Sequence, residues 1–130
     1  MRCLAIAAAA IAAACAGSPN MELQQPDWSG PPLAVTSRAD GGLALELSAP
    51  TAGHAFQLRA IEVFDDRAEV RLLHRTPGSA IVAQVVTPLP IAVPAESLAG
   101  RRCVRLWVAT QHGSDAPVSA PALAFVLLRP

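Results

Sequence analysis

The stretch Pro50-Thr51-Ala52-Gly53-His54 decides the fold, because it separates two runs of alternating apolar residues. One run leads into it in steps of two from Leu43 to Leu47, and another leads out from Phe56 to Ala60. Alternation with a period of two is typical of a strand that buries one face. Proline, threonine and glycine in succession end a strand and turn the chain. The stretch therefore predicts a corner between two strands.

The same alternation continues through the rest of the chain. Groups rich in Gly, Pro and Asp separate the runs, as in Asp40-Gly41-Gly42 and Thr76-Pro77-Gly78-Ser79. The runs predicted to be strands cover residues 33–37, 43–48, 55–64, 68–74, 81–86, 89–93, 102–110 and 122–128. About eight short strands at this spacing predict an all-β fold, a small antiparallel β-sandwich of the immunoglobulin-like kind with about seven or eight strands.

Residues 55–64 and 68–74 are predicted to form an antiparallel hairpin, because a short turn separates them. The apolar residues of 55–64 change face after Ala60, which predicts a bulge or a strand that passes from one sheet to the other. In the second run, Glu69 and Arg71 are predicted to point outward while their neighbours face the core.

The next two runs predict a covered strand and an edge strand. Residues 81–86 are apolar on both faces apart from Gln84, as in a strand that is covered on both sides. In the run that follows, Pro88, Pro90 and Pro94 share one parity, so the missing N–H donors all lie on one side. We interpret this run as an edge strand that resists further β-pairing; a polyproline linker is the alternative.

The first residues have the pattern of an export signal. Arg2 precedes an unbroken apolar run at 4–14, which is too short for a membrane span of about 20 residues. Ala12-Ala13-Ala14-Cys15 looks like the lipobox of bacterial lipoproteins, in which the cysteine is acylated and becomes the mature N-terminus. Cleavage after Ala16 by ordinary signal peptidase is the alternative.

The chain is therefore predicted to have three parts: a signal peptide at 1–14 with Cys15 as the lipidated mature N-terminus, a flexible tether at 15–32, and a β-sandwich domain at 33–130. In lipoproteins of this type, alanine after the cysteine implies the outer membrane. We expect a cell-envelope protein that the N-terminal lipid anchors on the periplasmic side of that membrane.

The distribution of charge argues against a nucleic-acid partner, and the placement of the cysteines argues against a disulfide bond. The chain has ten basic residues, all arginine and scattered, and ten acidic residues, so its net charge is zero. A nucleic-acid partner is therefore not expected. Cys103 has no expected disulfide partner, because Cys3 would leave with the signal and Cys15 would carry the lipid.

No group of residues has the spacing of an active site. His54, His74 and His112 lie in separate segments without metal-ligand spacing. Asp65-Asp66 fits a turn, and Cys103 lies in a strand run without the glycine elbow of a nucleophile. We therefore expect no enzyme activity, no metal and no cofactor.

Arg105 and Trp107 form the one strand-borne pair that suggests a protein contact. They share a face two residues apart, and arginine and tryptophan are enriched at the centres of protein interfaces. The structural interpretation is that Trp107 fills the second face of a central strand. Pro50, Thr51, Gly53 and His54 are the other candidate contact residues.

Residues 48–98 resemble the C-terminal domain of PrcB-like protease-complex lipoproteins. The shared pattern is a corner like Pro50-Thr51-Ala52-Gly53-His54, a charged hairpin, the turn Pro77-Gly78, and Thr87-Pro88 before an apolar strand flanked by proline. His54 replaces an aromatic residue of that pattern, and Ala52 replaces a glycine. The resemblance implies a small all-β domain of exported bacterial proteins, which stabilises or binds a protease in the member that names the family.

The corner is also similar to a loop of chagasin-like cysteine-protease inhibitors, which have an immunoglobulin-like fold. In those inhibitors, three loops at one end of the sandwich enter the protease cleft. The equivalent segments here are residues 49–54, 76–80 and 111–117. The Arg-Pro-Trp and Gly-x-Gly-Gly motifs of the inhibitors are missing from this chain.

Overall fold

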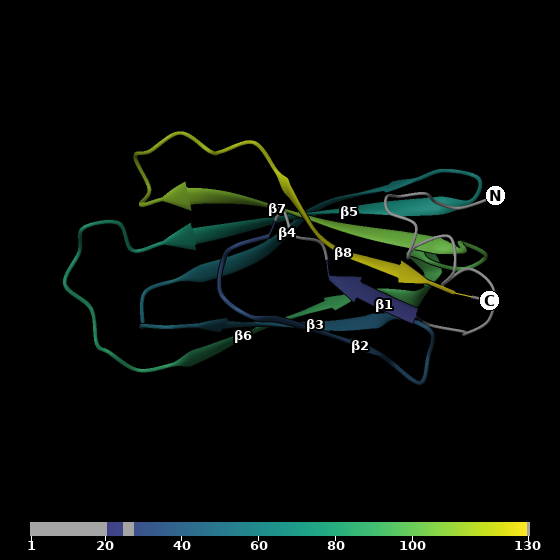
Figure 1. Ribbon diagram of the computed structural model, residues 1–130, viewed down its shortest axis with the longest axis horizontal. Helices are drawn as coiled ribbons and strands as arrows, with labels where there is room; N and C mark the ends of the chain where they lie inside the picture. Colours follow the sequence, from purple (N-terminus) through teal and green to yellow (C-terminus); the bar gives the residue numbers. More distant parts are fainter. Residues whose placement is uncertain (1–20, 25–27, 130) are drawn as a thin grey trace.

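The structure is a computed structural model that describes residues 21–24 and 28–129. Within these ranges the chain forms a β-sandwich of a five-stranded sheet, in the order β1-β8-β7-β5-β4, and a three-stranded sheet, in the order β2-β3-β6 (Figure 1). The predicted all-β sandwich is confirmed. The elements are β1 (Met21–Gln24), β2 (Leu33–Ser37), β3 (Leu43–Ala49), β4 (Ala55–Val63), β5 (Arg67–Thr76), β6 (Thr87–Val93), the 3-10 helix η1 (Ala95–Ser97), β7 (Cys103–His112) and β8 (Ala122–Leu128).

One strand pair departs from the expected antiparallel arrangement. β5 and β7 run parallel inside the five-stranded sheet, with Arg67 opposite Cys103 and Thr76 opposite His112. The chain leaves β5 for β6 in the other sheet and returns as β7, and a crossover of this kind brings the second strand back in the same direction. Side chains alternate in both arrangements, so the sequence pattern does not distinguish them.

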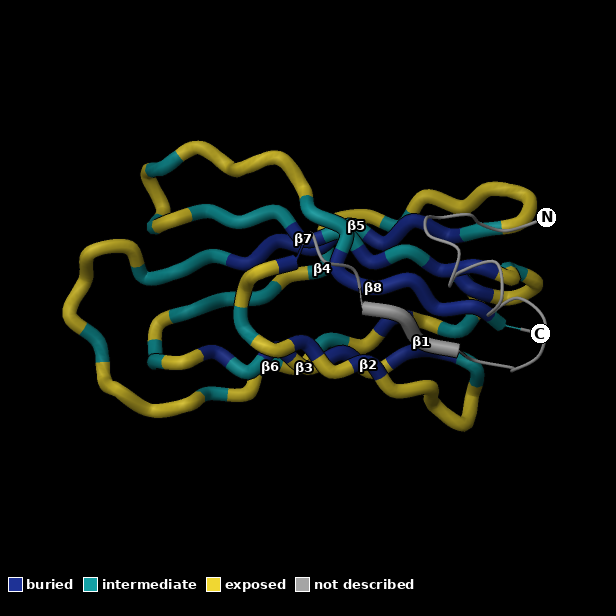
Figure 2. Tube along the Cα trace, in the orientation of Figure 1, coloured by how far each residue is buried: buried dark blue, intermediate teal, exposed yellow. Residues whose placement is uncertain are grey.

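The core lies between the two sheets, where Figure 2 shows the buried segments facing one another. Side chains of one parity fill it, as the alternation predicted. On β3, β5 and β7 these side chains are at most 2% exposed, and they are Leu43, Leu45, Leu47, Val70, Leu72, Val104, Leu106 and Val108. Burial of one Val or Leu side chain contributes about 1.5–3 kcal/mol. Packing must stabilise the described domain, because its cysteine, Cys103, is unpaired.

Two predicted irregularities of the strands are confirmed. The pairing of β4 with β5 shifts between Leu58 and Ala60, which is the bulge that the change of face indicated. β6 is an edge strand, because it pairs with β3 alone, and its Pro88 and Pro90 are exposed. The bulge keeps apolar side chains on the core side of β4 over most of its length.

The prediction of a covered strand at residues 81–86 is wrong. The segment 77–86 is a loop that joins β5 in one sheet to β6 in the other, and Ile81, Val85 and Val86 are exposed. A segment that crosses between two sheets cannot run beside a strand of either sheet over its whole length. Residues with high β-propensity form a strand only where another strand is available to pair with them, and this segment has none beside it.

The folded body begins earlier than residue 33. β1 lies inside the predicted tether at 15–32 and pairs with β8, with Met21 opposite Leu128. Trp28 is buried in the core cluster, and its Nε1 donates a hydrogen bond to the carbonyl oxygen of Pro31 at 3.0 Å. The signal peptide and Cys15 lie outside the described residues. In the described part of the chain, no helix has the length and apolar character needed to cross a membrane.

Candidate functional site

Three connections between strands gather at one end of the sandwich, at the left in Figure 1, and we call residues 50–54, 77–86 and 113–121 together the loop end. Backbone hydrogen bonds link them: the Ala52 amide donates to the carbonyl of Ala83 at 3.0 Å. The Gly113 amide donates to the carbonyl of Thr76, also at 3.0 Å. The segments 49–54, 76–80 and 111–117 that the sequence grouped therefore do lie at one end.

The loop end exposes branched apolar side chains. Ile81 is fully exposed, Val85 and Val86 are 58% and 68% exposed, and Val118 in the third connection is 51% exposed. A single exposed apolar residue is ordinary, but four β-branched ones on adjoining loops indicate a contact surface. Gly53 is exposed beside them, with Pro77 and Val82 next to it.

His54 and His74 form a hydrogen-bonded pair, which we call the histidine pair, beneath these loops. Nδ1 of His54 lies 2.8 Å from Nε2 of His74, and the two rings are parallel within 8°. Nε2 of His54 lies 3.1 Å from the Thr51 hydroxyl, which in turn lies 3.2 Å from the carbonyl oxygen of Ala52. The hydroxyl donates to this carbonyl, so it accepts from His54, and His74 Nε2–H donates to His54 Nδ1.

Both imidazoles of the histidine pair are neutral at pH 7. Burial, with a smaller contribution from the neighbouring His54 and His112, lowers the pKa of His74 to about 4. Burial also lowers the pKa of His54. His74 is 3% exposed, and its Nδ1 is buried without a hydrogen-bond partner among the described residues.

His112 at the end of β7 does not complete a metal site with this pair. Its Nδ1 lies 3.4 Å from the Thr76 hydroxyl. Among residues 28–129, no three His, Cys, Asp or Glu side chains lie together in a way that could hold a metal ion. Two imidazoles joined by a direct hydrogen bond also have one nitrogen of each ring already occupied.

Arg105 and Trp107 lie away from the loop end, on the outer face of the five-stranded sheet. Trp107 is half-buried, its Nε1 donates to a carboxylate oxygen of Glu69, and the Arg71 guanidinium lies 5.4 Å from the centre of its ring. Glu69 also pairs with Arg105 at 3.6 Å and with Arg67 at 2.8 Å. The structure therefore separates the candidate contact residues into two places.

Glu69 differs from its expected environment. It points away from the core, as its parity predicted, but it is 5% exposed rather than solvated. The indole of Trp107 and the side chains of Arg67 and Arg105 provide its hydrogen bonds and ion pairs. Long amphipathic side chains on neighbouring strands cover a short one between them, which a single strand pattern does not reveal.

Cys103 lies at the start of β7, whereas His112 lies at its end, so the two cannot act together. The thiol is buried, and burial raises its pKa although Arg105 acts in the opposite direction. A protonated, buried thiol is a small apolar core residue rather than a nucleophile.

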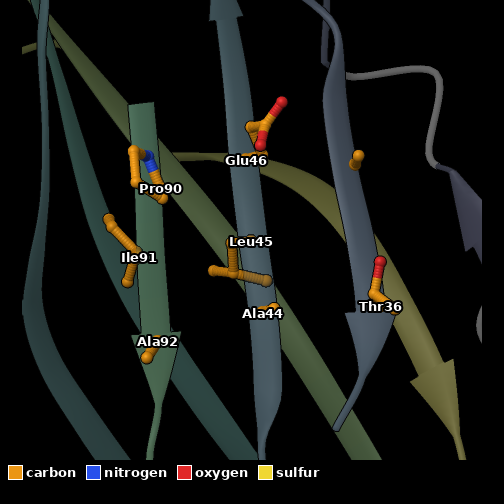
Figure 3. Close-up of a pocket in the computed structure, with 8 residues that line it drawn as sticks. Thr36, Ala44, Leu45, Glu46, Pro90, Ile91 and Ala92 are labelled. Carbon is orange, nitrogen blue, oxygen red and sulfur yellow. The ribbon is translucent and has the colours of Figure 1, made fainter. Parts of the chain in front are cut away.

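A shallow hollow lies on the outer face of the three-stranded sheet (Figure 3). Small or apolar side chains form most of its lining, which consists of Ala34, Thr36, Ala44, Leu45, Glu46, Pro90, Ile91 and Ala92. Glu46 is its one charged group. Small-molecule sites usually enclose their ligand and direct several polar groups toward it, so this open face is a poor candidate site.

Sequence reasoning singled out the corner but missed the contact between His54 and His74. A clue was available, because β4 and β5 pair as a hairpin in which Phe56 lies opposite His74. His54 precedes Phe56 by two residues and therefore lies diagonally across from His74 on the same face.

Comparison of the chain with protein-family models, with curated proteins and with solved structures finds no match.

Proposed function

We propose that this protein is a non-catalytic, exported domain, anchored in the cell envelope by a lipid on Cys15, that binds a protein partner through the loop end. The observation that carries the proposal is the group of exposed apolar side chains on the adjoining loops, above all Ile81, Val85 and Val86. Interfaces combine such side chains at their centre with polar groups around them. The export pattern before Cys15 supports the location.

The loop end is a better contact surface than the other faces of the sandwich. The outer face of the five-stranded sheet commits its Glu69 carboxylate to Trp107, Arg67 and Arg105. The three-stranded sheet presents Pro88 and Pro90 at its edge, which cannot donate to an added strand. A protease that the domain stabilises is the partner class that the resemblance to PrcB-like lipoproteins suggests. A contact through Arg105 and Trp107 stays a prediction.

Site-specific crosslinking in cells tests the proposal. A photoreactive residue in place of Ile81 should trap one partner in a defined ratio, whereas the same residue in place of Val63 should not. Val63 is a matched control because it is also an exposed, branched apolar residue, 45% exposed, but lies at the opposite end of β4. Equal crosslinking from the two positions, or none from Ile81, contradicts the proposal.

The anchor has its own test. Cys15→Ser should release the protein from membranes, because it removes the sulfur that carries the lipid. Unchanged membrane fractionation of Cys15→Ser contradicts lipidation at this residue. Such a result would not bear on the proposed contact at the loop end, which the crosslinking experiment tests separately.

A second function is inhibition of cysteine proteases by the loops 49–54, 76–80 and 111–117. The gathering of these three segments at one end favours it, since the inhibitors that the corner resembles use three loops in this way. The full-length protein should then inhibit papain, and Thr51→Arg should abolish the inhibition while Arg38→Ala, in the turn before β3, should not. Absence of inhibition by the unaltered protein rejects this function.

A further inference from the structure

Within the loop end, a chain of side-chain hydrogen bonds connects the corner at residues 50–54 to the five-stranded sheet. The chain runs from the Ala52 carbonyl through the Thr51 hydroxyl and His54 to His74, with distances of 3.2, 3.1 and 2.8 Å. His74 belongs to β5, which is a central strand, and is almost fully buried. The corner is therefore attached to the rigid sheet through two imidazoles.

The same corner contacts residues 81–86, which are the most exposed part of the loop end. Its Ala52 amide donates to the Ala83 carbonyl at 3.0 Å, and Gly53 lies against Val82. Within the described residues, this is the one backbone hydrogen bond that joins 81–86 to another segment. A movement of the corner would therefore change the position of Ile81 and Val85.

The proton count of the histidine pair limits its stability in acid. The neutral pair carries two protons on four nitrogens, and one of them occupies the space between His54 Nδ1 and His74 Nε2. A third proton must go to His74 Nδ1, which is buried without a partner in the described structure. A fourth proton would place two N–H groups against each other across 2.8 Å, so the doubly charged pair cannot keep this geometry.

Among the described side chains, no acid is placed to stabilise a charged pair. The titratable groups that act on His74 are His54 in the corner before β4 and His112 on β7, and both oppose a positive charge. Arg75, its neighbour on β5, lies on the opposite face and donates to Gln111. Asp115 in the third connection is exposed and forms no ion pair among the described residues.

We propose that Thr51, His54 and His74 form a pH-sensitive latch that holds the contact surface in place when both imidazoles are neutral and releases it in acid. The inference rests on the proposed function for its meaning, because it concerns the regulation of the same surface. The opening of the latch in acid does not itself require a bound partner. Opening of the corner lets both rings reach water and titrate normally, so acid favours the open form.

Nuclear magnetic resonance on the full-length protein tests the latch. The imidazoles of His54 and His74 should both titrate below the ordinary imidazole pKa near 6.5. The protection of the Ala52 amide from hydrogen exchange, corrected for the intrinsic rate, should fall about 30-fold between pH 7.5 and 5. Titration of the pair near pH 6.5, or protection that is constant over this range, overturns the proposal.

A variant separates the latch from general acid sensitivity. His74→Asn should leave Ala52 weakly protected at every pH, while His112→Asn should keep the pH dependence, because His112 is outside the hydrogen-bonded chain. If His74→Asn does not fold, the titration of the unaltered protein still decides. If the latch holds but crosslinking at Ile81 finds no partner, the proposed function fails and the latch does not.

Discussion

The two ends of the sandwich are held together in different ways. At the opposite end, the turn end of residues 38–42, 64–66 and 94–102, arginine side chains tie the turns. The Arg129 guanidinium donates to the Gly41 carbonyl at 2.9 Å, and that of Arg101 donates to the Asp65 carbonyl at 3.0 Å. The loop end has longer connections. The Gln111 side chain of β7 donates to the Ala116 carbonyl of the third connection at 2.8 Å, and the histidine pair ties the corner at 50–54 to β5.

The difference teaches which end can respond to solution conditions. A guanidinium stays protonated at every pH that a folded protein experiences, so the turn end keeps its donors. Imidazole titrates within the range that proteins meet, so the loop end can lose its tie. Exposed Ile and Val side chains also gather at the loop end, where movement would alter a contact without disturbing the core.

The largest effect is expected from Gly42→Ala at the turn end. A Cβ at this position would lie 2.5 Å from the Val93 carbonyl oxygen and 3.2 Å from the Ala95 amide, which are backbone atoms that cannot rotate away. We expect a loss of about 2–3 kcal/mol in the free energy of unfolding, measured in urea. Gly100→Ala is the control, because its added Cβ would meet nothing within 4 Å and only its left-handed φ of +75° should lower stability, by about 1 kcal/mol. Equal losses for both variants would contradict the rigid turn end.

Acid should destabilise the protein through the loop end. The folded pKa of His74, about 4, lies below the unfolded value near 6.5. Its contribution is therefore complete above about pH 6.5 and declines as the pH falls toward 4. We expect a loss of about 2 kcal/mol between pH 7.5 and 5 in urea unfolding, an interval in which most carboxylates stay ionised. A His74→Asn variant with the same pH dependence would show that another group is responsible.

Gly53→Ala should cost less than Gly42→Ala, although Gly53 has a φ of +88°. The left-handed conformation disfavours alanine by about 1 kcal/mol. The nearest atoms, Val82 Cγ1 at 3.0 Å and Pro77 Cβ at 3.1 Å, belong to side chains of a loop that can adjust. Thermal unfolding of both variants compares the ends directly, and a larger loss for Gly53→Ala would reverse the assigned order of rigidity.

The smallest effect on stability is expected from Ile81→Ser. The side chain is fully exposed, so its replacement does not change the apolar area buried in the isolated protein. The thermal midpoint should not change measurably, whereas crosslinking to the partner from Val85 should weaken. A clear fall in the thermal midpoint would mean that Ile81 packs inside the protein.

Much of the strand pattern follows from the sequence. The strands at Leu33–Ser37 and Ala122–Leu128 were predicted at both boundaries. The bulge after Leu58 was indicated by the change of face, and the prolines of β6 indicated an edge. These features are local, because alternation and missing N–H groups can be read from neighbours in the chain.

The departures all depend on neighbours distant in sequence. Glu69 is buried by an indole and a guanidinium from β7. Residues 81–86 have the composition of a strand, but their place between two sheets leaves them exposed. The parallel pairing of β5 with β7 depends on the path of the chain through the other sheet, which alternation does not encode.

The sequence by itself determined most of the turns and which residues of the strands face inward, although it predicted a strand at 81–86 where the chain forms a loop. That the corner at 50–54 lies beside two other loops was implied only by a resemblance. Only the tertiary structure decided that His54 meets His74, and that Arg105 and Trp107 lie on a different face from the corner. The physical reason is that turns and alternation arise from the backbone within a few residues. Side-chain contacts across a sandwich depend instead on strand register and on how the sheets are packed.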